Sequence, residues 1–408
     1  MSKRILPGLM LAVLLISMLT LTFNIQPGEA SGTIYIRADG SIDPPTAPIH
    51  RNGDVYTLTD NIAADGYYGI VVERDNIVVD GAGFTVQGTW AYCDHGIYLW
   101  GRSNVTVKNT RITGFLHGIT LYGSSNNVLT GNTIINISWA GIVLGYSSNN
   151  NTLTGNTMTN SGNGTWLGDS SNCNSIFGNN MTNNKCGIGF LGSSNNNVIY
   201  HNNFINNARQ VHDYSLDYPD FPPSINVWDD GYPSGGNYWS DYNGTDINED
   251  SIGDTPYVID ANNQDNYPLM GPWTVGGQNV TVTPSNDVTI TFGNVTSEGI
   301  TTLNVSSTGP EPPSGFKLTT ETPTYYDIKT TANYTGPIQL SVTYNDTGLT
   351  QEQENNLRLM HWNETLQQWT DITTYLDTES NFIYGETTHL SMFAIMTPTA
   401  IISGPYYT

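Results

Sequence analysis

The tripeptide Ser-Ser-Asn occurs four times at a spacing of 23 residues, as Ser124-Ser125-Asn126, Ser147-Ser148-Asn149, Ser170-Ser171-Asn172 and Ser193-Ser194-Asn195. A fixed period in the twenties is typical of stacked structural repeats. A column of Gly followed by Ile or Thr keeps nearly the same spacing, at Gly96-Ile97, Gly118-Ile119, Gly141-Ile142, Gly164-Thr165 and Gly187-Ile188. Together the two columns predict about five copies of one structural unit.

Within each copy, apolar residues alternate with polar ones, as in Ile97 and Leu99 or Ile142 and Leu144. This period of two indicates short β-strands and not helices. A leucine-rich repeat is disfavoured, because the segments between the strands consist of Asn, Ser, Gly and Thr. The pattern therefore predicts a parallel β-helix, in which each coil stacks on the next at about 4.8 Å.

Stacked coils bring equivalent residues into columns. One column is a candidate ladder of side-chain amides and contains Asn132, Asn156, Asn179 and Asn202. A second column, two residues further along, is a candidate interior row and contains Ile112, Ile134, Met158, Met181 and Phe204. With an earlier, looser copy that starts near Gly69, we expect about six coils.

These coils resemble the parallel β-helix repeats of the NosD-like group, which has the pectin-lyase type of right-handed β-helix. The resemblance covers about residues 33–272 and rests on the Ser-Ser-Asn coils, on Val79-Asp80-Gly81-Ala82-Gly83 and on the segment from Trp228 to Tyr242. The chain also resembles secreted archaeal surface proteins that carry a C-terminal β-sandwich. The group includes copper-maturation proteins, carbohydrate-active enzymes and surface proteins, so the resemblance implies a fold more than an activity.

The N-terminus has the pattern of a signal peptide. Lys3 and Arg4 precede an apolar run that ends at Leu21, and a small residue, Ala30, offers a cleavage site. We expect residues 1–30 to be removed, although an uncleaved anchor is an alternative. No second apolar run is long enough to span a membrane, so the mature protein is expected to be secreted or held at the cell surface.

Composition divides the rest of the chain. We expect an N-terminal cap at 31–66, the coils at 67–206 and a C-terminal cap at 207–273. From residue 274 to residue 408 the period disappears, and alternating Thr and Val residues predict an antiparallel β-sandwich. The predicted fold class is all-β, a right-handed parallel β-helix followed by a β-sandwich domain.

The predicted C-terminal cap is rich in aromatic residues. An open end of a β-helix exposes apolar interior and unpaired backbone, which must be covered. Candidate covering residues are Phe221, Trp228, Tyr238, Trp239 and Tyr242.

The same cap contains an acidic loop that resembles a calcium-binding loop. Oxygen ligands at alternate positions of a tight turn suit Ca²⁺. The resemblance implies ligands at Asp246, Asn248, Asp250, Ile252 (through its carbonyl) and Asp254. Ser251 replaces the usual glycine and Tyr257 stands where a bidentate Glu is expected, so a solvated acidic turn is the alternative.

Copper is a second candidate metal. His95 and His117 precede equivalent glycines in successive coils, so stacking predicts that they lie about 5 Å apart. No third ligand is evident in their column, and histidines that cap turns are the alternative.

Charge limits the class of partner. The chain has 13 Lys and Arg against 36 Asp and Glu, a net charge of −23, which disfavours nucleic acid and favours cations. Three cysteines are too few for a disulfide scaffold. Candidate glycosylation sites are Asn104, Asn136, Asn163, Asn243, Asn294 and Asn333.

An enzyme is not the preferred interpretation, and no catalytic residues are assigned. Between His95 and Asn207 the only acidic residue is Asp169, whereas glycoside hydrolysis needs two carboxylates. A carbohydrate-active enzyme, either a polysaccharide lyase or a hydrolase, remains an alternative if carboxylates between Glu73 and Asp94 converge.

The preferred interpretation is a secreted or cell-surface structural or binding protein, stabilised by calcium, whose partners are polysaccharide or surface-layer components. A copper-binding protein of the NosD type is the other alternative. Contact with a glycan would require exposed aromatic residues such as Tyr98, Trp100 and Tyr122.

Overall fold

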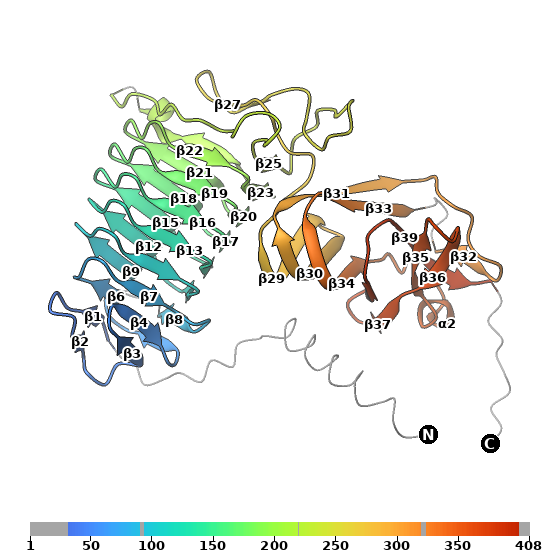
Figure 1. Cartoon of the computed structure of the whole chain (residues 1–408), viewed down its shortest axis with the longest axis horizontal. Helices are drawn as coiled ribbons and strands as arrows, with labels where there is room; N and C mark the ends of the chain where they lie inside the picture. The colour runs from blue at the N-terminus through green and yellow to red at the C-terminus, as the bar shows by residue number, and fades with distance from the viewer. Residues whose placement is uncertain (1–31, 90–93, 219, 320–323, 400–408) are drawn as a thin grey trace. The chain divides into compact units, whose positions relative to one another are not determined.

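The computed structural model describes residues 32–89, 94–218, 220–319 and 324–399. The predicted signal peptide lies outside these residues. Two compact units meet at the boundary between Trp273 and Thr274, the first a solenoid of parallel strands and the second a set of antiparallel sheets (Figure 1). The predicted all-β class, a parallel β-helix followed by an antiparallel β-sandwich, is confirmed.

Three sheets run along the solenoid, and each coil adds one strand to each of them. Sheet A has the order β2-β1-β6-β9-β12-β15-β18-β21-β24, with β1 (Ile34–Ile36), β2 (Ile42–Asp43), β6 (Tyr68–Val72), β9 (His95–Trp100), β12 (His117–Tyr122), β15 (Ala140–Gly145), β18 (Asn163–Gly168), β21 (Cys186–Leu191) and β24 (Val211–Asp213). Sheet B has the order β22-β19-β16-β13-β10-β7-β4-β3, with β3 (Ile49–Asn52), β4 (Val55–Leu58), β7 (Val78–Asp80), β10 (Thr106–Lys108), β13 (Val128–Thr130), β16 (Thr152–Thr154), β19 (Ser175–Phe177) and β22 (Val198–Tyr200). Sheet C has the order β25-β23-β20-β17-β14-β11-β8-β5, with β5 (Ile62–Ala64), β8 (Thr85–Gly88), β11 (Arg111–Thr113), β14 (Thr133–Ile135), β17 (Thr157–Thr159), β20 (Asn180–Thr182), β23 (Asn203–Ile205) and β25 (Tyr238–Trp239).

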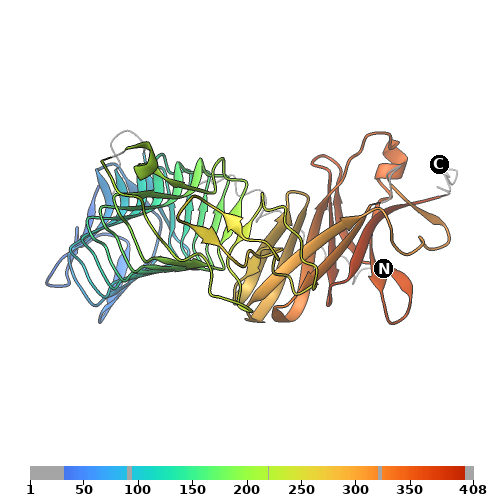
Figure 2. The ribbon, with the colours of Figure 1, turned by 90° about the horizontal axis from the view of Figure 1, so that it is seen from above.

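The solenoid has about seven coils, one more than the period alone predicts. The extra coil comes from residues 34–64, where β1, β4 and β5 pair in parallel with β6, β7 and β8. Its turns differ in length from the later coils, so it lacks their regular spacing. Figure 2 shows the successive coils, coloured from blue to green, following one another along the solenoid.

The predicted interior row is confirmed. Ile134, Met158, Met181 and Phe204 pair in register along sheet C and are fully buried. Equivalent rows line the inside of sheets A and B, so every strand turns one set of side chains into a continuous apolar core. One member departs from this pattern, because Thr165 occupies an interior position between Ile142 and Ile188 and its buried hydroxyl has no hydrogen-bond partner among the described residues.

The predicted amide ladder is present and extends one residue further. Each side chain donates to the next Oδ1 at 2.9–3.0 Å, from Asn132 through Asn156, Asn179 and Asn202 to Asn237. A second ladder, not predicted, connects Asn127, Asn151, Asn174, Asn197 and Asn226 in the same way. Because each Oδ1 also accepts a backbone N–H from the preceding coil, the ladders satisfy buried turn groups that no strand reaches.

The C-terminal end of the solenoid is covered by aromatic residues. Trp239 stacks on Phe204 with ring centroids 4.3 Å apart, and Trp228 packs edge-on against Phe190. Both tryptophans are buried, whereas Phe221 is 43% exposed and does not cover the core. The prediction was therefore wrong for Phe221, which lies in a surface loop after the 3₁₀ helix η1 (Tyr214–Asp217). The cap also contains the short hairpin of β26 (Tyr257–Val258) and β27 (Gln264–Asp265).

The second unit is a two-sheet antiparallel β-domain. One sheet contains β28 (Trp273–Thr274), β31 (Gly299–Ser306), β32 (Phe316–Leu318), β33 (Tyr325–Thr330), β35 (Arg358–Asn363), β36 (Gln368–Asp371) and β39 (Met392–Pro398). The other contains β29 (Gly277–Ser285), β30 (Val288–Ser297), β34 (Asn333–Thr343), β37 (Thr373–Asp377) and β38 (Phe382–Thr387). Residues from both sheets form one apolar core, and a single helical turn, α2 (Gln351–Glu354), precedes β35.

The central ladder residue Asn156 provides a test of the stacking. Asn156→Ala removes the acceptor for the main-chain and side-chain donors of Asn132 and leaves buried groups unpaired. We expect a loss of at least about 3 kcal/mol in the free energy of unfolding of the solenoid, measured by urea denaturation. The control is Asn243→Ala, an exposed asparagine in the same unit. Equal stability of the two variants would contradict a structural role for the ladder.

Candidate functional site

The outer surface of sheet A carries a concentration of aromatic side chains. We call this surface the aromatic face and define it as Tyr68, His95, Tyr98, Trp100, His117, Tyr122, Trp139, Tyr146, Trp166 and Tyr214. It extends along sheet A from β6 to the end of β24, and each of its rings lies within 6.5 Å of at least one other. Side chains alternate along a strand, so the buried neighbours Leu99, Leu121 and Leu167 place Trp100, Tyr122 and Trp166 outside. Tyr68, His95 and His117 lie near the starts of their strands and join the face through their ring contacts.

Small residues form the floor of the aromatic face. Thr120 and Val143 point outward between interior neighbours, yet they are 0% and 1% exposed. Gly145 lies directly beneath Tyr122, because a Cβ at this position would approach the tyrosine ring within 2.9 Å. Trp166 lies over Gly189 in the same manner, at 2.8 Å. The rings therefore lie down over the sheet, where glycine and other small residues give them room.

Three rings at one edge of the face form a distinct group, which we call the platform: Trp100, Tyr122 and Tyr146. Tyr122 meets both neighbours edge-on, with centroids 6.1 Å from Trp100 and 4.9 Å from Tyr146. Trp100 and Tyr146 are nearly parallel, at 6.2 Å and 29°. Trp100 is 62% exposed and Tyr146 is 58% exposed, so the outer surfaces of both rings face solvent.

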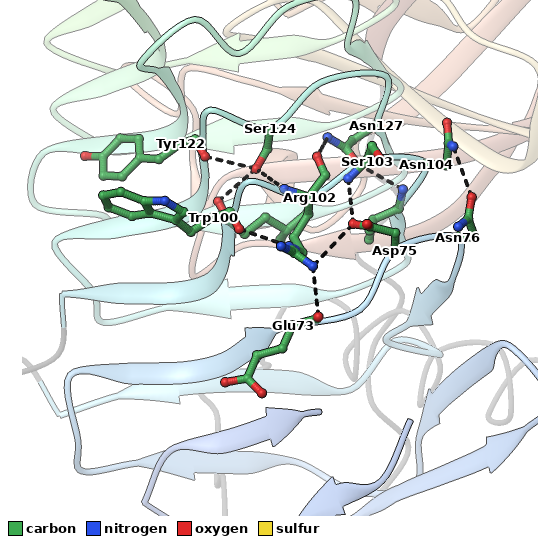
Figure 3. A network of polar contacts seen from close by, with 12 residues as sticks. Glu73, Asp75, Asn76, Trp100, Arg102, Ser103, Asn104, Tyr122, Ser124 and Asn127 are labelled. Atoms are coloured by element: carbon green, nitrogen blue, oxygen red, sulfur yellow. Dashed lines mark hydrogen bonds and ion pairs between the residues drawn. The ribbon is translucent and has the colours of Figure 1, made fainter. Parts of the chain in front are cut away.

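A polar network holds the turn that follows Trp100 (Figure 3). The Arg102 guanidinium donates to the carbonyl of Trp100 and to the carbonyl of Glu73, each at 2.9 Å, and lies 3.5 Å from Asp75. The main-chain N–H of Arg102 donates to Ser124 Oγ of the next coil. Figure 3 shows Trp100 and Tyr122 projecting away from this network on the same side. Arg102 therefore connects three coils behind the platform.

The histidines of the face stack on each other. His95 and His117 pair in register, and their rings are 4.7 Å apart at an angle of 15°. His95 Nδ1 lies 2.7 Å from Thr120 Oγ1, and His117 Nδ1 lies 3.1 Å from the carbonyl of Asp94. Burial lowers the pKa of His95 to about 3, with a further contribution from His117. Burial also lowers the pKa of His117, so both rings are neutral at pH 7.

The carboxylates of the first coils do not converge. Glu73 pairs with Arg37 at 3.1 Å, and Arg37 also pairs with Asp43. Asp75 lies 3.5 Å from Arg102. Asp80 lies at the end of β7 in sheet B and pairs with Lys108 at 3.0 Å. Each of these carboxylates is paired with a cation, Arg37 serving both Glu73 and Asp43, and this arrangement suits structural ion pairs.

The acidic loop of the C-terminal cap folds around its own carboxylates. Asp246 accepts the main-chain N–H groups of Asp250 and Ser251, and Asp254 accepts that of Ile247. Asp250 accepts the N–H of Ile252 and the side-chain amide of Asn248. A carboxylate that accepts one or two hydrogen bonds keeps further lone pairs that could bind Ca²⁺. Calcium binding by this loop stays a prediction.

The candidate glycosylation sites differ in exposure. Asn104, Asn136, Asn243 and Asn333 are exposed, and Asn294 is half-buried. Asn163 is only 5% exposed, and its side-chain nitrogen donates to the carbonyl of Trp139. The folded chain has no room for a glycan at Asn163, which we withdraw as a candidate. Cys173 is exposed and Cys186 is buried, both without a disulfide, while Cys93 lies outside the described residues.

Sequence reasoning named Tyr98, Trp100 and Tyr122 as residues that a glycan could contact, but it missed Tyr146. Tyr146 follows the last residue of β15 and is therefore one position beyond the repeat column of Trp100 and Tyr122. Four further rings of the face were missed: Tyr68 and Trp166 lie in strands β6 and β18, Trp139 directly precedes β15, and Tyr214 begins η1. The sequence did contain a signal for part of this surface, because the aromatic residues Trp139 and Tyr146 directly flank the strand β15.

A family model described as "Periplasmic copper-binding protein (NosD)" matches residues 33–244, which is about half of the chain. The chain belongs to the NosD family. No curated protein matches this sequence.

Three solved structures illustrate what this NosD-family protein is similar to. The periplasmic alginate epimerase AlgG is 22% identical over 43% of this chain and 45% of its own, with a TM-score of 0.35. The alginate lyase from Paenibacillus sp. str. FPU-7 is 14% identical over 51% and 81%, with a TM-score of 0.30. The Dettilon tailspike protein is 12% identical over 84% and 86%, with a TM-score of 0.25. The chain spans less than half the length of AlgG, and none of these similarities bears on activity.

The name of the family implies copper, so the geometry of the candidate donor groups in this chain is compared with what a copper site requires. A metal ion lies close to the plane of each imidazole that binds it, so two ligand rings must direct their nitrogens toward one point. The rings of His95 and His117 are almost parallel and lie face to face, so their nitrogens do not converge. Among the described residues, no third His, Cys, Asp or Glu side chain completes a metal-binding group with these two rings. The described residues around His95 and His117 therefore do not fit a copper centre.

In the part of this NosD-family chain that the structure describes, neither helical segment is long and apolar enough to span a membrane.

The buried histidine of the aromatic face predicts a pH dependence of stability. The folded-state pKa of His95, about 3, lies below the unfolded value near 6.5, so the unfolded chain binds more protons in acid. This contribution to stability is fully present above about pH 6.5 and is lost as the pH falls toward 3, with a slope of up to about 1.4 kcal/mol per pH unit. His95→Gln should reduce the slope in urea denaturation of the solenoid between pH 7 and pH 4. The matched control, His50→Gln, removes an exposed imidazole. An unchanged slope in His95→Gln would contradict the prediction.

Calcium binding by the acidic loop can be tested through stability. If the loop binds Ca²⁺ with the millimolar to submillimolar affinity of extracellular modules, 5 mM Ca²⁺ should stabilise the folded solenoid by about 1–2 kcal/mol. Calorimetric melting would then show a higher transition temperature with Ca²⁺ than with Mg²⁺. Asp250→Asn keeps an acceptor for the N–H of Ile252 but removes a negative charge, and it should abolish the shift. Asp220→Asn, at an exposed carboxylate of the same unit, is the control. Identical melting with and without Ca²⁺ would exclude the site.

Proposed function

We propose that this NosD-family protein is an extracytoplasmic glycan-binding protein that contacts a polysaccharide through the aromatic face of sheet A. The observation that carries the proposal is the exposure of Trp100 and Tyr146, which are 62% and 58% exposed and nearly parallel. Large aromatic side chains are normally buried in a folded domain, and an exposed group of them marks a binding surface.

The chemistry of a sugar ring suits this surface. One face of a pyranose carries mostly C–H groups, which pack against the flat face of an aromatic ring, while hydroxyl groups project from its edge. Trp100, Tyr122 and Tyr146 offer the aromatic component, and the turns beside them are rich in Ser and Asn, which donate and accept hydrogen bonds. Aromatic rings combined with a few polar groups that fix orientation are typical of ligand sites.

The rigidity of the solenoid favours such a role. Tyr122 lies over Gly145, and the turn after Trp100 is held by Arg102 through the carbonyls of Trp100 and Glu73. Rings that are already fixed lose little conformational entropy when a ligand binds, so more of the contact energy appears as affinity.

The family description supports an extracytoplasmic address, since it names periplasmic proteins. A protein outside the cytoplasm meets cell-surface and environmental polysaccharides, and the acidic composition of the chain keeps it soluble there. The N-terminal pattern predicted to be a signal peptide agrees with this location.

The experiment is affinity electrophoresis of the mature chain, in native gels that contain one soluble polysaccharide each. We expect retardation by at least one polysaccharide, and Trp100→Ala should weaken that binding at least 10-fold, which corresponds to about 1.4 kcal/mol. The control Tyr232→Ala removes a ring of similar exposure, 60%, in the C-terminal cap. Absence of retardation by every polysaccharide, or equal retardation of Trp100→Ala and the parent, would overturn the proposal.

A further inference from the structure

Tyr146 has an unusual backbone conformation for an aromatic residue. Its φ is +53°, in the left-handed region. The same turn position in the neighbouring coils is occupied by Gly101, Gly123 and Gly192, with φ between +55° and +68°, and by Asp169, with φ of +52°. Most other non-glycine residues of this chain that adopt positive φ are asparagines, which tolerate it. A bulky side chain at such a position destabilises the fold relative to glycine.

Packing in the core does not account for this tyrosine. Tyr146 is 58% exposed, and its described ring contacts are with Tyr122 and Trp100, which belong to the same surface. The left-handed turn directs the ring toward the two preceding coils. An unfavourable conformation that places a side chain on an exposed surface is typical of a functional residue.

The charges near the platform indicate which sugars it accepts. The guanidinium of Arg102 is directed at Trp100 O, Glu73 O and Asp75, and not at the outer surface of the rings. Asp169 is exposed in the turn of the coil next to Tyr146, and no ion pair involves it in the described part of the chain. A uronate or sulfated sugar on the platform would meet this carboxylate without an available cation, and the net charge of −23 adds to the repulsion.

We infer that the platform binds neutral pyranose residues, and that Tyr146 occupies its left-handed position in order to stack on them. This inference rests on the proposed function and adds the chemical class of the ligand and the residue that selects it. The ligand is a polysaccharide without carboxylate or sulfate groups, such as a β-glucan or a galactomannan. Trp100 and Tyr146 contact the C–H faces of its sugars, and Tyr122 fixes the spacing between them.

The test compares two classes of polysaccharide and two substitutions at one position. Neutral probes are mixed-linkage β-glucan, galactomannan and starch, and acidic probes are polygalacturonate and alginate. The parent chain should be retarded by at least one neutral probe and by neither acidic probe. Tyr146→Gly and Tyr146→Ala should both weaken that binding at least 10-fold.

Stability separates a binding role from a packing role. Glycine accepts the left-handed conformation, so Tyr146→Gly should melt no lower than the parent and higher than Tyr146→Ala, while both variants lose binding. A melting temperature for Tyr146→Gly more than about 5 °C below the parent would show that the ring is there to stabilise the fold, and would overturn the inference.

The binding results test the neutral class of the ligand separately from the proposed glycan-binding function. Retardation by the acidic probes alone, lost in Trp100→Ala, would overturn the neutral class and leave the proposed glycan-binding function standing. Retardation by no probe at all would overturn both. Full binding by Tyr146→Gly, together with loss of binding in Trp100→Ala, would remove Tyr146 from the site.

Discussion

The structure of the solenoid depends on the register between one coil and the next. From β1, β4 and β5 onward, each strand of sheets A, B and C pairs in parallel with the equivalent strand of the neighbouring coil, so a residue lies above its equivalent. Isoleucine and leucine rows fill the interior, and amide ladders satisfy the turns. Because each coil contacts mainly its two neighbours, the ends are the weak points of the stack, and aromatic residues of the C-terminal cap close one of them.

The same register that builds the core also arranges the aromatic face. Side chains alternate along each strand, so the rows that point inward determine which positions point outward. Because successive coils pair in register, His95 lies beside His117 and Trp100 lies beside Tyr122, whatever the chemistry of these side chains. This explains why two histidines can stack closely and yet fail to direct their nitrogens at a shared metal ion: their spacing is set by the backbone and not by a ligand.

Sequence predicted the parts of this structure that follow the period. The interior row from Ile134 to Phe204 and the ladder from Asn132 to Asn202 were readable because apolar residues in the first, and asparagines in the second, recur at a nearly constant spacing. The second ladder, through Asn127 and Asn151, was equally regular and was overlooked. Features outside the period were not readable: the first coil has turns of different length, the burial of Trp228 against Phe190 depends on how the cap folds back, and Phe221 remains exposed. Calcium binding was inferred from a local motif, and it stays a prediction.

The turn column that contains Gly101, Gly123, Tyr146, Asp169 and Gly192 is the position where one coil can differ from another without cost to its neighbours' strands. Its residues neither pair within a sheet nor enter the interior. A chain that grows by duplicating coils could thus keep the core rows constant while it varies this single column. Recognition and folding are then encoded at separate positions of the repeat, and new specificity can arise one coil at a time.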